Sequence, residues 1–326
     1  MQDNLQFTGK DGSDFHKCKM ADIPGFAVSP EKAESNGQIQ PIPHPSSQSS
    51  SLNLRNLKAV DPEAAKSVAV VWGDLPAMKT IKNQQAANVQ NEGAKLAGVF
   101  SYPVTGLSDW TPLAKQVIDS GATAMTFVGE PTNLGALVKT LREQGWKGTP
   151  LLETNAYDQI YSDSAGAANA EGSQIRSVFH PFEEADKWPA VKQYEEILKQ
   201  YVPDGKQALL GMQSFSAWLL FATAAKDCAK SDKDTLTREC VLKAADAAKD
   251  WTAGGLHAPM DPAPEGGVPA PCEMLLTVKA DGTFERAYPK IKGKADGGDG
   301  FVCDPSAVFA VPENKGLGVT SPDQPI

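Results

Sequence analysis

Residues 67–72 read SVAVVW, an unbroken apolar run that is rich in valine. A strand buried on both faces of a sheet has this composition, because helices cover both of its sides. A helix is expected soon after the run, since Pro76 can occupy the first turn of a helix. The apolar side chains expected to face inward along this helix and its exit are Met78, Ile81, Val89 and Leu96.

The same alternation of apolar runs and helical patterns continues to about residue 180. Further strands are expected at GVFSYP (98–103), TAMTFV (123–128), PLLET (150–154) and IRSVF (175–179). Helices are expected from a cap at Thr111 to Gly121, and from Asn133 to Gln144. Strands that alternate with helices favour right-handed crossovers, so the sequence predicts an α/β fold with a parallel, doubly wound sheet.

The pattern becomes helical after His180, with helices expected at 188–201, 212–225 and 235–249. Three helices without an intervening strand indicate a segment that packs on a different sheet. The stretch EMLLTVKADGTFERAYP (273–289) then predicts a β-hairpin whose tight turn is ADGT.

The overall charge and hydropathy exclude some classes of partner. The chain has 326 residues and a formal net charge of −9, which opposes binding to the phosphates of nucleic acid. No apolar stretch approaches the length of about 20 residues that crosses a bilayer. The N-terminal segment MQDNLQFTGKDGSDFHKCKM lacks the apolar core of a signal peptide, which by itself would indicate the cytoplasm.

Four of the five cysteines fall into two candidate pairs, Cys228 with Cys240 and Cys272 with Cys303. If they form disulfides, the protein belongs to an oxidising compartment. From spacing alone, reduced and partly buried thiols are an equal alternative. Cys18 has no obvious partner.

The ligand site is expected where the strands end, because ligands of open α/β sheets bind outside the carboxyl ends of the strands. Aromatic faces beside carboxylates and amides suit a small amphipathic molecule, including one that carries an ammonium group. The alternative is that these segments are solvated loops with turn-forming Asn and Asp. The predicted ligand-binding residues are Trp72, Asp74, Glu130, Thr132, Asn155 and Tyr157, and the same segments also carry Asp109, Trp110 and Asp158.

Motifs for catalysis and for cofactors are not found. No phosphate-binding glycine loop, nucleophile elbow or metal-ligand spacing of His or Cys occurs, so no catalytic residue, metal or cofactor is predicted. His180 follows a strand and could act as a general base, but a structural role fits it better. An enzyme is therefore the weaker alternative.

Several of these segments, in their order, resemble the type I periplasmic binding protein family, in particular its branched-chain amino acid-binding branch. They are VAVVWGD (68–74), the long segment 109–132, PLLETNAYD (150–158), GMQSFSAWLLFATAAKDC (211–228) and 273–289. The resemblance implies a two-lobed fold that closes on a small organic solute and delivers it to the permease of an ABC transporter. It also implies an extracytoplasmic location, with membrane contact only through the transporter or through a lipid anchor that this chain lacks. The paired cysteines resemble those of actinobacterial members.

The resemblance also implies a division of the chain. Residues 1–58 would be a remnant of the first lobe and a crossover, and 59–182 the second lobe. Residues 183–260 would return to the first lobe, and 261–326 would make a final pass into the second lobe and form a tail. The crossover at about residue 38 comes earlier than in the family, so the chain is expected to be a fragment without its signal peptide and part of its first lobe. Such a fragment is expected to bind ligand weakly and to melt early. A ligand-sensing receptor domain of the same fold stays an alternative.

Overall fold

The computed structural model describes residues 21–34, 38–231, 236–264 and 267–315. The chain divides into two compact units. Unit 2 comprises Ser50–Leu209 and Pro271–Val308, and unit 1 comprises Met1–Ser49, Leu210–Ala270 and Phe309–Ile326. Strands β1 (Gln48–Ser50) and β10 (Val308–Ala310) pair in a two-stranded sheet at residues where the chain passes from one unit to the other.

Unit 2 is built on one mixed sheet in the order β3-β2-β4-β5-β6-β7-β8, with β9 paired to β7. Strands β2 to β6 are parallel, whereas β7 runs antiparallel to β6, β8 and β9. The α/β fold and the parallel sheet are therefore confirmed, and so is the hairpin of β7 and β8. The strands are β2 (Ser67–Gly73), β3 (Lys95–Tyr102), β4 (Ala124–Val128), β5 (Thr149–Leu152), β6 (Gln174–Ser177), β7 (Cys272–Val278), β8 (Phe284–Tyr288) and β9 (Val302–Cys303).

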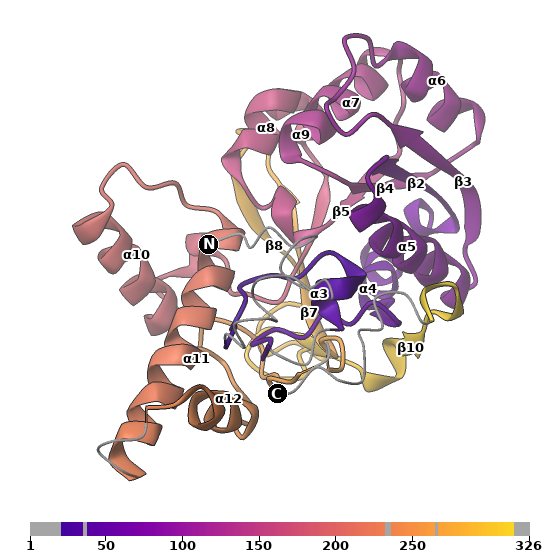
Figure 1. Cartoon of the computed structure of the whole chain (residues 1–326). Helices are drawn as coiled ribbons and strands as arrows, with labels where there is room; N and C mark the ends of the chain where they lie inside the picture. Colours follow the sequence, from indigo (N-terminus) through magenta and orange to yellow (C-terminus); the bar gives the residue numbers. More distant parts are fainter. Residues whose placement is uncertain (1–20, 35–37, 232–235, 265–266, 316–326) are drawn as a thin grey trace. The chain divides into compact units, whose positions relative to one another are not determined.

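Helices cover both faces of this sheet (Figure 1). Helices α4 (Leu52–Val60) and α5 (Lys79–Asn91) lie on one face, and α6 (Thr111–Asp119), α7 (Pro131–Glu143), α8 (Gln159–Ala165) and α9 (Ala167–Ala170) lie on the other. Helix α10 (Pro189–Tyr201) also belongs to unit 2. Short 3-10 turns are formed by Ala64–Lys66, Pro76–Met78, Thr154–Ala156, Phe182–Glu184, Pro305–Ala307 and, in unit 1, Pro312–Asn314.

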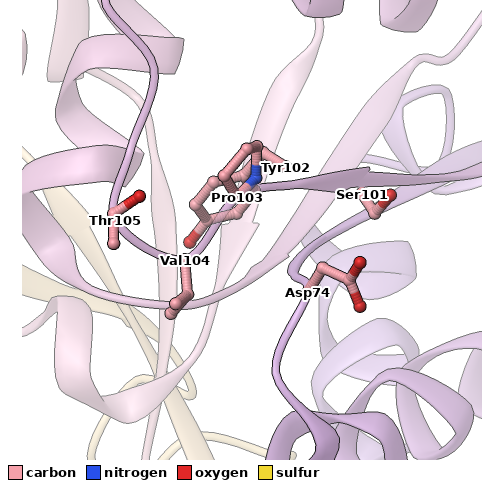
Figure 2. Close-up of a pocket in the computed structure, with 6 residues that line it drawn as sticks. All are labelled: Asp74, Ser101, Tyr102, Pro103, Val104 and Thr105. Atoms are coloured by element: carbon pink, nitrogen blue, oxygen red, sulfur yellow. The ribbon is translucent and has the colours of Figure 1, made fainter.

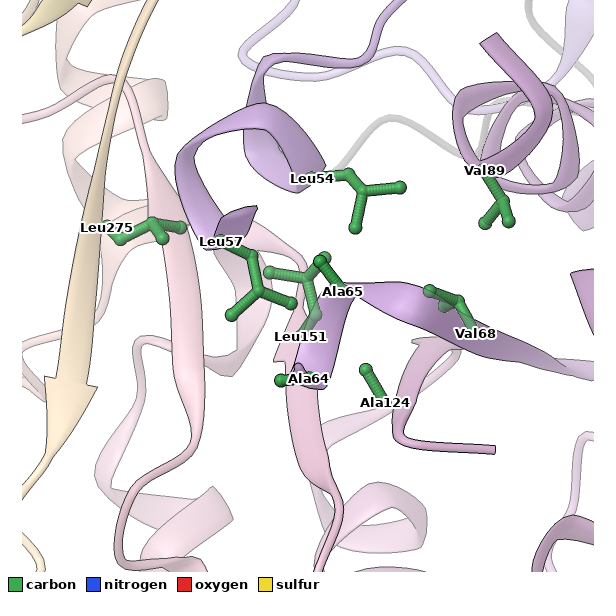
Figure 3. Close-up of a cluster of buried hydrophobic side chains, with 9 residues drawn as sticks. All are labelled: Leu54, Leu57, Ala64, Ala65, Val68, Val89, Ala124, Leu151 and Leu275. Carbon is green, nitrogen blue, oxygen red and sulfur yellow. The ribbon is translucent and has the colours of Figure 1, made fainter. Parts of the chain in front are cut away.

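One apolar core of unit 2 lies between the sheet and helices α4 and α5 (Figure 3). Leu54 and Leu57 of α4 pack against strand side chains, and Val89 of α5 completes the layer. Each fully buried leucine contributes about 1.5–3 kcal/mol relative to an exposed one. The strand residues of this cluster are Val68, Ala124, Leu151 and Leu275, joined by Ala64 and Ala65.

The α5 helix differs from its predicted inward face. Val89 is buried as predicted, but Met78 and Ile81 are only partly buried, and Leu96 belongs to strand β3. The buried positions of α5 are mostly polar: Thr80, Gln84, Gln85, Asn88 and Val89. A search for apolar periodicity misses this face, because its amides are buried against polar partners and not against the apolar core.

Two helix starts also differ by one or two residues from the prediction. Thr111 is the first residue of α6 and not its cap, and α7 begins at Pro131 and not at Asn133. In both helices a proline occupies the first turn, where its missing N–H group leaves no helical hydrogen bond unmade.

Unit 1 is largely helical in its described part. It contains α3 (Pro30–Ala33), α11 (Leu209–Ser231) and α12 (Arg238–Asp246). Helix α11 is longer than predicted. Helix α12 is shorter and begins later than predicted, because the side chain of Thr237 caps it by accepting a hydrogen bond from the backbone N–H of Cys240 (3.2 Å). The apolar cluster between these helices comprises Ile39, Leu220, Ala224, Cys228, Val241, Leu242 and Ala245.

Both candidate cysteine pairs form disulfides, which confirms the pairing. Cys228–Cys240 joins α11 to α12 with a Cα–Cα distance of 5.9 Å, and Cys272–Cys303 joins β7 to β9 with a Cα–Cα distance of 4.0 Å. Cys18 lies outside the described residues. Within the described part of the chain, no helix is long and apolar enough to span a membrane.

The boundaries of the compact units differ from the predicted segments. Unit 2 begins at Ser50 and not at residue 59, because α4 supplies its core. It extends beyond residue 182 to Leu209, because the residues that precede α10 pack within unit 2. Which lobe of the family each unit represents stays a prediction.

Candidate functional site

The strand order of unit 2 creates a switch point between β2 and β4. The chain leaves β2 through α5 on one face of the sheet, and it leaves β4 through α7 on the other face. The connections therefore diverge beyond the carboxyl ends of these two neighbouring strands. In open α/β sheets this divergence forms the crevice in which ligands bind.

Glycines at the ends of β2 and β4 make room for a buried tyrosine. A Cβ atom on Gly129 would lie 1.8 Å from the hydroxyl oxygen of Tyr102, and one on Gly73 would lie 3.2 Å from the same atom. The ring of Tyr102 stacks on Phe127 and tilts against Trp110, with 5.2 Å between centroids in each case. The end of β3 is thus held against the ends of β2 and β4 by side-chain packing.

A pocket of about 490 Å³ opens beside this tyrosine (Figure 2). Two contacts hold its walls: the backbone N–H of Asp74 donates to the carbonyl of Tyr102 (2.8 Å), and Nδ2 of Asn133 donates to the carbonyl of Val104 (3.2 Å). This volume suits a small organic molecule. The pocket is lined by Asp74, Ser101, Tyr102, Pro103, Val104 and Thr105.

The other predicted residues follow the same edge of the sheet. Trp72 is half-buried, with Nζ of Lys82 5.7 Å from the centroid of its ring. Glu130 and Thr132 are exposed at the start of α7. Asn155 is partly buried, and its Nδ2 donates to the carbonyl of Gly129 (2.8 Å), which ties the segments after β4 and β5 together.

Tyr157 is placed differently, inside unit 2. Its side chain is 2% exposed, and its hydroxyl donates to Glu183 (2.5 Å) and accepts from the backbone N–H of Phe182 (2.8 Å). Burial, together with the neighbouring charge of Glu183, raises the pKa of Tyr157 well above its usual range. This hydroxyl is already bonded twice, so the geometry supports a structural role for Tyr157. Its contact with ligand stays a prediction.

The remaining residues of the predicted edge have structural partners. Trp110 is buried against Tyr102. Asp109 accepts a hydrogen bond from the backbone N–H of Thr111, which lowers the pKa of Asp109. Asp158 caps α8 and forms an ion pair with Lys206 (2.7 Å).

In the segment 102–111 sequence reasoning named Asp109 and Trp110, and their contact with ligand stays a prediction. The pocket uses the segment's first four residues, Tyr102 to Thr105, and not Asp109 or Trp110. The sequence feature that could have pointed to these pocket residues is the position of Tyr102 directly at the end of a strand. Asn133 was missed because an amide that bonds to a distant carbonyl leaves no local pattern.

Two histidines that could have served in catalysis are buried and do not line this pocket. His180 stacks on Trp188, with ring centroids 3.6 Å apart. His257 lies in unit 1, where its Nε2 is 2.9 Å from the hydroxyl oxygen of Ser216. This resembles a nucleophile–base pair, but Ser216 is 0% exposed and also accepts a hydrogen bond from Nε1 of Trp251 (3.0 Å). The described residues contain no group of three or more His, Cys, Asp or Glu that could hold a metal ion.

The pocket offers both polar and apolar surface to a ligand. Asp74 presents a carboxylate at its wall, Ser101 and Thr105 present hydroxyls, and Pro103 and Val104 present apolar surface. In small-molecule sites a few polar groups in a concave, partly apolar lining fix the orientation of the ligand.

Comparisons with known proteins agree with this fold. A family model described as periplasmic binding protein matches residues 23–283. A substrate-binding protein of an ABC transporter from Aeropyrum pernix superimposes with a TM-score of 0.70 at 14% identity, over 92% of this chain and 74% of that one. A leucine-binding protein from Thermotoga maritima gives 0.68 at 15% identity, over 90% and 75%.

An extracellular ligand-binding receptor from Rhodopseudomonas palustris gives a TM-score of 0.64 at 18% identity, over 84% of this chain and 76% of that one. No curated protein matches the chain. At these identities the structures establish a shared fold, and the family model establishes membership over most of the chain. The chain therefore belongs to the periplasmic binding protein family, and its fold is that of the type I members.

Proposed function

We propose that the chain is the substrate-binding component of an ABC transporter, which captures a small organic solute outside the cytoplasm and delivers it to a membrane permease. Family membership supports a ligand-binding role, and two similar structures are a leucine-binding protein and a substrate-binding protein of an ABC transporter. The proposed solutes are branched-chain amino acids, amides and related compounds.

The observation that carries this proposal is the pocket beside the β2/β4 switch point, with Asp74 in its wall. We propose that Trp72, Asp74, Glu130, Thr132 and Asn155 contact the solute, with Tyr157 supporting the segment behind them. The exposed carboxylates of Asp74 and Glu130 favour a solute that offers hydrogen-bond donors or a positive charge at this end.

In the proposed mechanism the solute makes additional contacts with unit 1 when the protein closes. A ligand shifts a conformational equilibrium only by its difference in affinity for the two states, so contact with both units is required. Binding with a dissociation constant of about 1 μM, or about −8 kcal/mol, is expected for the complete two-lobed protein. The closed form is then the state that the permease recognises.

A ligand screen tests this function. Leucine, isoleucine, valine, short amides and urea are added to the purified protein in a thermal-shift assay, and each hit is titrated by calorimetry. For a hit, Asp74→Asn and Glu130→Gln are each expected to weaken binding at least about tenfold, which corresponds to about 1.4 kcal/mol. Controls are Asp119→Asn and Glu143→Gln, two exposed carboxylates at the far ends of α6 and α7.

Unchanged affinity in both site variants would reject the proposed contacts, whereas the absence of any hit among these solutes would reject the proposed solute class. Chemical conversion of a bound solute, followed by mass spectrometry, would favour the enzyme alternative. The location is tested separately, by fractionating cells that produce the protein from its own locus.

A further inference from the structure

A layer of polar side chains crosses the sheet of unit 2, on the face covered by α5 and between the apolar core and the ligand-binding edge. Alternate residues of a strand share a face, so positions two residues from the core residues stay on the core side. On β4, after β5 and on β7, these positions lie toward the carboxyl edge of the parallel strands. The next side chains toward this edge are Thr126 beyond Ala124, Glu153 beyond Leu151 and, because β7 is antiparallel, Glu273 beyond Leu275.

Hydrogen bonds connect this layer into one network. Nε2 of Gln85, from α5, donates to Oε1 of Glu153 (2.8 Å), and Nε of Arg176, from β6, donates to Oε2 of Glu153 (2.7 Å). The guanidinium of Arg176 also donates through Nη1 to Oε1 of Glu273. Thr126 donates to Oε1 of Gln85 (3.3 Å).

The network contains two carboxyl groups and only one guanidinium. Both oxygens of Glu153 accept hydrogen bonds, whereas Oε2 of Glu273 has no partner among the residues that the structure describes. Glu153 and Arg176 retain contact with solvent, with 16% and 21% of their side chains exposed, but Glu273 is 0% exposed. If both carboxyl groups were ionised, the negative charge without a partner would therefore lie on Glu273, the residue of the network that has no contact with solvent.

Among the residues that the structure describes, no neighbouring element supplies the missing positive charge. Beside Glu273, the backbone pairs with Val302 of β9, and the Cys272–Cys303 disulfide lies next to it. The charged groups on the elements that pack against β7 are engaged elsewhere or exposed. Arg55 and Lys58 of α4 pair with Glu92, Asp304 beside β9 pairs with Arg55, Arg286 of β8 pairs with Glu184, and Glu285 of β8 is exposed.

We propose that unit 2 contains a proton-binding site, in which the carboxyl group of Glu273 binds a proton at Oε2 while Glu153 keeps the ion pair with Arg176. One proton balances the network, because it leaves one carboxylate for one guanidinium. An unpaired charge in a protein interior is far less favourable than a neutral carboxyl group in the same place.

The expected titration follows from the same arrangement. Burial raises the pKa of Glu273 to about 7; Arg176 opposes this shift and the charge of Glu153 adds to it. The folded protein therefore holds the proton more tightly than the unfolded chain does. This contribution to stability is complete below the ordinary pKa of 4.5 and is lost as the pH rises through about 7.

Glu273→Gln tests the site, because glutamine imitates the protonated carboxyl and cannot ionise. Urea unfolding of the full chain is measured from about pH 5 to about pH 9. Near pH 5 the wild type and Glu273→Gln should have similar unfolding constants. Between about pH 5 and about pH 7 the constant of the wild type should rise relative to the variant by up to about tenfold per pH unit, as release of one proton on unfolding requires, and above about pH 7 the ratio should level off.

Two further variants separate a proton site from a purely structural role. Glu153→Gln leaves Arg176 and Glu273 as a balanced pair, so the loss of stability between about pH 5 and about pH 7 should shrink. Glu285→Gln, on the exposed side of β8, should keep the wild-type profile. Parallel profiles for the wild type and Glu273→Gln would overturn the proposal.

A measurement on the wild type alone covers the case in which Glu273→Gln does not fold. A buried, protonated carboxyl has an infrared carbonyl band that is distinct from the bands of carboxylates. This band should be present in the folded protein at about pH 6 and absent at about pH 9. Its absence at the lower pH would equally reject the site.

Discussion

At the scale of single residues, one buried hydroxyl of unit 1 connects two other side chains. Ser216 lies between Trp251 and His257 and bonds to both, and Nδ1 of His257 lies 2.7 Å from the carbonyl of Ala258. Because the imidazole must donate to this carbonyl, it accepts the hydrogen of Ser216 at Nε2. The serine is therefore a structural link between two buried side chains.

Ser216→Ala should lower the free energy of unfolding by about 1–3 kcal/mol, because it leaves two buried polar groups without their partner. Thr223→Ala, at an exposed position of the same helix, is the matched control and should change stability by less than about 0.5 kcal/mol. Urea unfolding measures both. Equal effects of the two substitutions would contradict the role given to Ser216.

His257 makes the stability of unit 1 sensitive to acid. Burial lowers the pKa of His257 from 6.5 to about 4, so the unfolded chain binds the proton first. The stability that neutral His257 contributes is present above pH 6.5 and is lost as the pH falls through about 4. His257→Gln should therefore melt with a shallower dependence on pH over this window in thermal scans. A dependence as steep as that of the wild type would mean that other groups cause the acid sensitivity.

At the scale of elements, the ends of three strands are brought together by one tyrosine and two glycines. A Cβ at position 129 would meet the hydroxyl of Tyr102 at 1.8 Å, so Gly129→Ala forces the tyrosine or the strand end to move. We expect a loss of stability of about 1–3 kcal/mol from this overpacking.

The double variant Gly129→Ala, Tyr102→Phe should recover part of that loss, because the hydroxyl is gone. Recovery is incomplete, since Phe127 also lies within 2.9 Å of the added Cβ. A double-mutant cycle in urea measures the coupling. Strictly additive effects would show that the two positions do not compete for space.

The disulfide between α11 and α12 links two helices that share one small apolar cluster. Replacing Cys228 and Cys240 together by serine should reduce stability by about 2–4 kcal/mol, mainly because the unfolded chain gains freedom. The melting temperature of the wild type in reducing buffer should fall at least as far as that of the double variant, because the Cys272–Cys303 disulfide is reduced as well. An unchanged melting temperature in the variant would contradict a stabilising disulfide.

At the scale of the whole molecule, the proposed function requires that one solute affects both compact units. Hydrogen exchange tests this once the ligand screen has found a solute. Saturating solute should slow exchange in the segments that line the pocket, 72–75 and 101–106, and also in backbone amides of unit 1. Protection limited to unit 2 would mean that the solute does not bring the units together, and the transport mechanism would lose its support.

The sequence was sufficient for the parallel sheet, the helices between its strands, the hairpin and the family resemblance, and the pocket lies in a segment that it predicted. These features depend on local patterns: apolar runs, prolines at helix starts, and the rule that ligands bind where parallel strands end. The pairing of the cysteines stayed open at that stage, because spacing along the chain does not measure the distance between sulfur atoms.

Only the tertiary structure decided which side chains contact one another. Tyr157 lies inside unit 2 because Glu183 and Phe182, 25 or more residues later in the chain, take its hydroxyl. Gln85, Arg176 and Glu273 meet although almost 190 residues separate the first from the last. Contacts between such distant positions depend on strand register and crossover direction, and these are set when the whole sheet assembles and not by any local stretch of sequence.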